Sequence, residues 1–220
     1  MDRRALSAGV LMLSLALGGC SALKLSTSDG DAAPVKIGVG EGSSAAPTST
    51  GSSIPEGIST VSVNLGAECP VAVELAMDPE WNDETAFDGY QLFTRDDDAI
   101  ITVNCNESRD DTAQEIVDKS RKYTFAEPGS TNQAEHMGTL SGGTYWTFHG
   151  TLAPTEMRAI EHSETVIYGA VVGIKDNGRL YKATVEMSTK SGDEATADRY
   201  EQMLPTVHIA DQELEPPAFS

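Results

Sequence analysis

The chain has 220 residues, of which 34 are acidic and 15 are basic, and its formal net charge at pH 7 is −19. A surface this acidic repels the phosphates of nucleic acids and the headgroups of anionic lipids, so we expect no nucleic-acid partner. The oxygen-rich segment Asp78–Glu84 lacks the glycine and the final glutamate of an EF-hand loop, so a solvated acidic face explains it better than a calcium site.

The N-terminus has the features of an export signal, because Arg3 and Arg4 precede an apolar run from Ala5 to Leu17. This run is too short to cross a hydrocarbon core of roughly 30 Å as a helix. The following Leu17-Gly18-Gly19-Cys20 resembles a bacterial lipobox, in which the cysteine is acylated and becomes the new N-terminus. We therefore predict a signal peptide over residues 1–19, lipidation at Cys20 and a location on the extracytoplasmic face of the cell membrane. An ordinary cleavage site that happens to contain cysteine is the alternative.

Residues 20–57 are expected to form the lipidated N-terminus and a tether. From Ser26 to Gly57 the chain consists mainly of Ser, Thr, Gly, Ala and Pro, with few large apolar side chains. Such a stretch cannot offset the entropy of ordering it, so we predict disorder. Its random-coil reach of roughly 30 Å would lift the folded part off the membrane.

Two cysteines, Cys69 and Cys105, remain once Cys20 is acylated. In an oxidising compartment an even pair favours a disulfide. Both residues share the apolar side of their predicted strands, so the two thiols can meet across the core. A pair of free, buried thiols is the alternative.

Residues 58–210 are predicted to form one domain, followed by a disordered tail over residues 211–220. Alternating apolar residues predict strands at residues 61–65, 69–75, 89–93, 100–105 and 144–152. Asp111, with Gln114 three residues later, can cap a helix that ends near Lys122.

The clearest signal is a hairpin near the C-terminus. Val166–Ile174 is almost wholly apolar, as in a central strand covered on both faces. Asn177-Gly178 favours a type I′ turn, and Leu180–Met187 then alternates. Ser191 opens a capping box for a last helix. Together these elements predict an α+β domain: a mostly antiparallel, twisted sheet flanked by two helices.

The succession of elements also resembles a known family. A small-residue turn, Ser141-Gly142-Gly143, leads into Tyr145-Trp146; the long hairpin follows, and the terminal helix runs into Leu204-Pro205-Thr206-Val207. From Ile58 to Ile209 this order is similar to that of the actinobacterial LpqN/LpqT-type lipoproteins, whose domain resembles the PsbP-like α/β/α sandwich. The resemblance implies a non-catalytic binding or accessory role in the cell envelope, and it assigns no ligand residues.

No motif marks a catalytic centre. Ser141 lacks the Gly-x-Ser-x-Gly spacing of a serine hydrolase, and the four histidines match no zinc-ligand spacing. We therefore expect no enzyme, no metal and no cofactor. A hydrolase that uses a pair of carboxylates stays as the alternative, because the chain is rich in acids.

Five aromatic residues fall on strands that should neighbour one another: Tyr145, Trp146, Phe148, Tyr168 and Tyr181. Core packing explains them. The functional alternative is a groove between sheet and helix that holds an apolar or glycolipid ligand. The sequence thus predicts a lipid-anchored module that binds an envelope protein or an envelope lipid.

Overall fold

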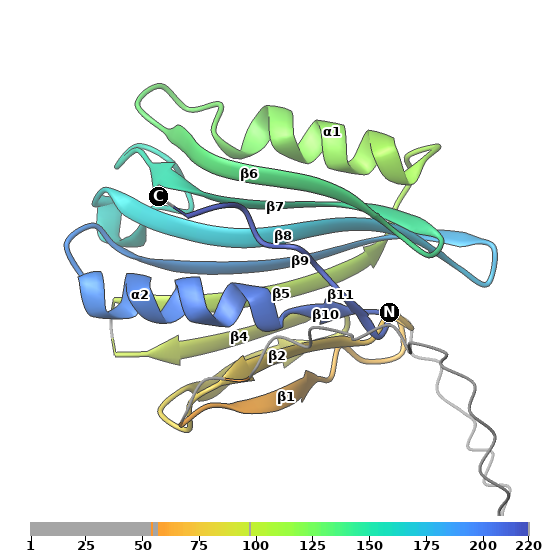
Figure 1. Ribbon diagram of the computed structural model, residues 1–220, viewed down its shortest axis with the longest axis horizontal. Coiled ribbons are helices and arrows are strands. Elements are labelled where there is room, and N and C mark those ends of the chain that lie inside the picture. The colour runs from red at the N-terminus through yellow and green to blue at the C-terminus, as the bar shows by residue number, and fades with distance from the viewer. Residues whose placement is uncertain (1–53, 55–56, 97, 220) are drawn as a thin grey trace, which may run out of the picture. The chain divides into compact units, whose positions relative to one another are not determined.

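A seven-stranded antiparallel sheet is the centre of the fold (Figure 1). The computed structural model describes residue 54, residues 57–96 and residues 98–219; Cys20 and the predicted signal peptide lie outside the described residues, as does nearly all of the predicted tether. In spatial order the strands are β3 (Asn82–Phe87), β4 (Tyr90–Arg95), β5 (Ala99–Glu107), β9 (Arg179–Lys190), β8 (Thr165–Asp176), β7 (Gly143–Leu152) and β6 (Thr131–Leu140).

A small second sheet joins the two ends of the domain. Its strands, in spatial order, are β1 (Ser59–Val63), β2 (Val73–Met77), β10 (His208–Ile209) and β11 (Gln212–Glu213). The helices are α1 (Ala113–Thr124) and α2 (Glu194–Met203), with single turns of 3₁₀ helix at Ile160–His162 and Leu204–Thr206. None of the helices within the described residues is long and apolar enough to cross a bilayer.

The two helices cover opposite faces of the large sheet, which confirms the predicted α+β architecture. Helix α1 lies on β8 and β7, where Ile116 and Val117 pack on Trp146 and Phe148; we call this cluster the α1 core. On the other face, Tyr200 of α2 belongs to a larger core that also takes in the small sheet. Both clusters are apolar and buried, so each helix is held by the stripe of side chains that its sequence provides.

The predicted disulfide is present. Cys69, just before β2, is bonded to Cys105 of β5, with a Cα–Cα distance of 5.7 Å. Both residues are buried in the larger core. The bond therefore links the segment that leads into the small sheet directly to the large sheet.

Local signals act largely as the sequence predicts. Asn177 and Gly178 both have positive φ, 47° and 81°, as a type I′ turn requires. Helix α1 starts one residue later than expected, because the side chain of Thr112, not that of Asp111, accepts the N–H of Glu115 at 3.1 Å.

Helix α2 also has a different cap from the predicted Ser191. The Asp193 carboxylate accepts the backbone N–H of Thr196 at 3.2 Å, so the helix begins after Asp193. Aspartate is among the preferred N-cap residues because its oxygen satisfies an otherwise unpaired donor of the first turn.

Helix α1 is also tied to the edge strand β6. The carboxylate of Glu135 accepts hydrogen bonds from Arg121 Nε at 3.1 Å and from the indole N–H of Trp146 at 2.9 Å. Trp146 is fully buried, so this carboxylate satisfies a donor that water cannot reach.

The C-terminal tail corrects the prediction of disorder over residues 211–220. Leu214 is only 2% exposed, and the hydroxyl of Thr147 donates to the carbonyl of Glu215 at 2.7 Å. Phe219 packs beside Tyr168, with ring centroids 5.9 Å apart. The tail is ordered because it packs on the side of β7 and β8 that faces the larger core. There it buries apolar side chains and accepts a hydrogen bond from the sheet.

Candidate functional site

The five aromatic residues singled out by the sequence do not form a shared groove. Tyr145, Tyr168 and Tyr181 lie in the larger core, whereas Trp146 and Phe148 lie under α1 on the opposite face. All five are at most 5% exposed, and none lines a cavity described below. The separation follows from strand geometry, because consecutive residues such as 145 and 146 point to opposite faces of a sheet.

The structure instead leaves part of the sheet uncovered beside α1. Helix α1 covers β8 and β7 but leaves most of the same side of β9, β5 and β4 free. We call this surface the open face; it consists of Tyr90, Leu92, Ile100, Thr102, Lys182, Thr184, Glu186 and Ser188. It carries two adjoining hollows that share Arg158 and Glu186.

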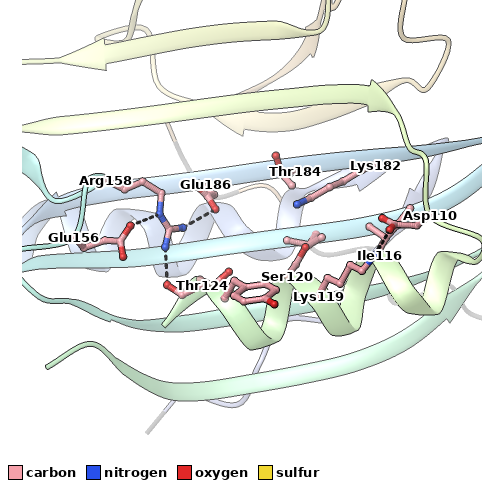
Figure 2. Close-up of a pocket in the computed structure, with 12 residues that line it drawn as sticks. Asp110, Ile116, Lys119, Ser120, Thr124, Glu156, Arg158, Lys182, Thr184 and Glu186 are labelled. Atoms are coloured by element: carbon pink, nitrogen blue, oxygen red, sulfur yellow. Dashed lines mark hydrogen bonds and ion pairs between the residues drawn. The ribbon is translucent and has the colours of Figure 1, made fainter. Parts of the chain in front are cut away.

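The first hollow lies between α1 and β9 and has a volume of about 360 Å³ (Figure 2). Arg158 closes one end of it. The guanidinium of Arg158 lies 3.1 Å from Glu186 and 3.3 Å from Glu156, and it donates to the carbonyl of Thr124 at 2.6 Å. Arg158 thereby ties its own loop to both the end of α1 and the middle of β9.

The opposite end of this hollow is formed by an ion pair between Lys119 and Asp110. Lys119 also lies 2.9 Å from Glu115, and Asp110 accepts a hydrogen bond from the hydroxyl of Ser108 at 2.9 Å. The hydrogen bond from the Lys119 ammonium is the main reason that the pKa of Asp110 lies below its ordinary value. Asp110 is therefore ionised at neutral pH and has no proton to donate.

Between these two ends lie Lys182 and Thr184 of β9 and Ser120 of α1. Figure 2 shows the nitrogen of Lys182 turned toward the middle of the cavity, away from Asp110. The side chain of Lys182 is partly buried, and its ammonium makes no hydrogen bond or ion pair to any residue that the structure describes. Burial lowers its pKa, and the negative charges of Glu186 and Asp110 oppose that effect.

Ser120 is the second unpaired polar group in the cavity. Its side chain is only 8% exposed, and its hydroxyl has no hydrogen-bond partner among the described residues. A buried hydroxyl without a partner is unusual in a folded protein and costs free energy. Lys182 and Ser120 therefore leave two unused hydrogen-bonding groups in one hollow.

The second hollow, of about 450 Å³, continues across β5 and β4 and is more apolar. Tyr90, Leu92 and Ile100 form its floor, and Met157 stands at its rim, 97% exposed. Phe87, also exposed, stacks on Tyr90 with ring centroids 4.7 Å apart. The open face thus joins a charged half to an apolar half.

Sequence reasoning missed the residues of this face, although one signal was available. The alternation of Leu180–Met187 assigns Tyr181 and Val185 to the core side, and it therefore assigns Lys182 and Glu186 to the other side. Charged residues on the second side of a central strand indicate that no helix covers it. Arg158 carried no such signal, because it lies in a loop.

Two carboxylates of the first hollow share one cation. Glu156 and Glu186 both reach the first hollow, but the guanidinium of Arg158 bonds to each of them. Within residues 57–96 and 98–219, no three His, Cys, Asp or Glu side chains are grouped so as to hold a metal ion.

Comparison of the sequence with known protein families and with curated proteins finds no match. Among solved structures, LpqN of Mycobacterium tuberculosis, described as involved in cell envelope biogenesis, is similar: 14% identity over 69% of this chain and 91% of that chain, with a TM-score of 0.48. The Ran-binding protein Mog1p of Saccharomyces cerevisiae is 13% identical over 70% and 96% of the two chains, with a TM-score of 0.41. A protein of Bacteroides thetaiotaomicron is 12% identical over 62% of this chain and 44% of its own, with a TM-score of 0.37. The similarity to LpqN that the sequence suggested is thus found among solved structures, at low identity.

Proposed function

We propose that the chain is a non-catalytic, lipid-anchored module on the extracytoplasmic face of the cell membrane that binds an envelope protein or lipid on its open face. The single observation that carries the binding role is the uncovered side of the central strand β9, with its two adjoining hollows. A concave surface with a few convergent polar groups is the usual form of a ligand site.

The anchor and the location rest on the sequence. Leu17-Gly18-Gly19-Cys20 supplies the acylation site, and the tether supplies the reach from the membrane. Radioactive palmitate should label the wild-type protein but not the Cys20→Ala variant, and globomycin should block processing of the precursor. Unchanged processing in globomycin would refute the assigned anchor.

The apolar half of the open face supports a macromolecular or lipid partner. Met157 is 97% exposed and lies above Leu92 and Ile100, where an apolar group of a partner can bury it. Burial of exposed apolar surface is a general driving force for association.

Site-specific photocrosslinking tests this surface in the host cell. A benzoylphenylalanine at Met157 should yield a defined adduct with protein or lipid in membranes. The same group at Thr60, exposed on β1 of the small sheet, is the matched control and should not. Equal adducts from both positions, or none from Met157, would contradict the proposed binding surface.

An envelope hydrolase that uses a carboxylate pair is the rival proposal, since Glu156 and Glu186 both reach the first hollow. Arg158 lies between them and bonds to both, which suits a structural role better than proton transfer. A panel of hydrolase substrates decides the matter: turnover that Glu186→Gln abolishes would establish the enzyme and overturn our choice.

A further inference from the structure

The amine of Lys182 stands apart from the other cations of the first hollow. Lys119 is paired with Asp110 and Glu115, and Arg158 is paired with Glu156 and Glu186. Lys182, although partly buried in a chain of net charge −19, has no such partner among the residues described. A partly buried cation that contacts no ion-pair partner loses hydration without regaining a hydrogen bond, and an anion that binds it restores one.

Ser120 provides a second, independent observation on the same cavity. Its hydroxyl is buried, lines the hollow from α1 and makes no hydrogen bond in the described part of the chain. Thr184, also buried, contributes a further hydroxyl from the strand opposite. An ammonium and two hydroxyl groups, each able to donate a hydrogen bond, thus line one hollow.

We propose that Lys182, Ser120 and Thr184 form a binding site for one singly charged oxyanion, a carboxylate or a phosphodiester, carried by the ligand of the open face. The oxygens of such a group accept a charge-assisted hydrogen bond from the ammonium and ordinary hydrogen bonds from the hydroxyls. Both unused groups of the cavity are then satisfied at once.

The carboxylates around the site set its charge preference. Asp110 and Glu186 are held by their own cations, so neither takes the place of the missing anion. Their negative charges nevertheless lie close enough to Lys182 to act on its titration. A dianion such as sulfate is repelled more strongly by both than a monoanion is, and a monoanion is therefore preferred.

This inference rests on the proposed function, since it names the chemistry of a ligand that the open face would take. The proposed function and the anion site can be refuted separately. A partner crosslinked at Met157 can dock through the apolar half alone, whereas anion binding at Lys182 is measured without any partner.

Nuclear magnetic resonance titration of the chain from residue 20 onward, carrying Cys20→Ala, tests the site. Acetate and dimethyl phosphate represent the two sources of a singly charged oxyanion, and sulfate is the dianion. Saturable shifts should centre on the amides of Ser120, Lys182 and Thr184. The tighter of the two monoanions identifies the group as carboxylate or phosphodiester, and sulfate should bind more weakly than either.

Variants distinguish this site from general attraction to positive charge. Lys182→Gln should weaken binding of the monoanion by about tenfold to a hundredfold, the range expected for losing one charged hydrogen bond. Ser120→Ala, a smaller change that keeps the fold, should weaken it by about threefold to tenfold. Lys175→Gln, on an exposed residue of β8, is the matched control and should leave it unchanged. Shifts that are absent, that fail to saturate, or that persist in Lys182→Gln would overturn the proposal.

Discussion

Reduction of the disulfide between Cys69 and Cys105 should lower the free energy of unfolding by about 4 kcal/mol. The bond closes a loop with a sequence separation of 36 residues. In the chain-entropy model a loop of this length removes about 13 cal/mol/K from the unfolded ensemble, or about 4 kcal/mol at 25 °C. Since whole domains are stable by about 5–15 kcal/mol, the bond accounts for a large share of the total.

Urea unfolding followed by tryptophan fluorescence measures this difference, because Trp81 and Trp146 are both buried in the folded chain. Reduced wild-type protein is the matched control for the oxidised form, since the two differ only in that two thiols replace the disulfide bond. The double variant Cys69→Ala/Cys105→Ala should have a slightly lower free energy of unfolding still, because it also removes buried sulfur atoms. Equal midpoints for the oxidised and the reduced protein would refute the loop-closure reasoning.

Substitutions at three further positions test local contacts of the fold. In Gly173→Ala the new Cβ would lie 2.5 Å from the carbonyl oxygen of Ala113, so the start of α1 must shift. We expect the free energy of unfolding in urea to fall by about 1–3 kcal/mol. An unchanged unfolding midpoint would contradict this contact. Asn177→Ala, at φ 47°, should cost about 1 kcal/mol in the same assay, whereas Asn177→Gly should cost almost nothing. The hydrogen bond from Arg121 lowers the pKa of Glu135 below its ordinary 4.5. The stability that this ionised carboxylate adds to the folded state is therefore fully present above pH 4.5, and it is lost as the pH falls through the lowered folded-state pKa. Glu135→Gln should therefore flatten the decline of stability as the pH falls below 4.5, and an identical decline in both proteins would count against the pairing.

The elements with strong local signals were predictable from the sequence. The apolar run of β8, the Asn177-Gly178 turn and the alternation of β9 each depend on neighbouring residues alone, and the structure confirms all three. The edge strands β3 and β6 were missed, because an edge strand carries many polar residues and alternates weakly.

The candidate site was harder to predict for a different reason. Whether an aromatic residue such as Trp146 faces a groove or a core depends on which helix covers that side of the sheet, and this is a long-range property. Lys182 and Ser120 are far apart in sequence and meet only because α1 packs beside β9. Arg158, in a loop with no periodicity, became visible only through its contacts with Glu156 and Glu186.

The small sheet has a consequence for how the chain acquires its structure. Its strands β1 and β2 are synthesised early, and β10 and β11 are synthesised late. Contacts across this interval are long in sequence: the N–H of Ala76 donates to the hydroxyl of Thr206, 130 positions later. If the chain is exported from its N-terminus, as the proposed function requires, the small sheet cannot be completed until β10 and β11 have emerged. Folding would then finish only after translocation is complete, and a nascent chain stalled a few residues short of its end would still expose the side of the core that Leu214 covers.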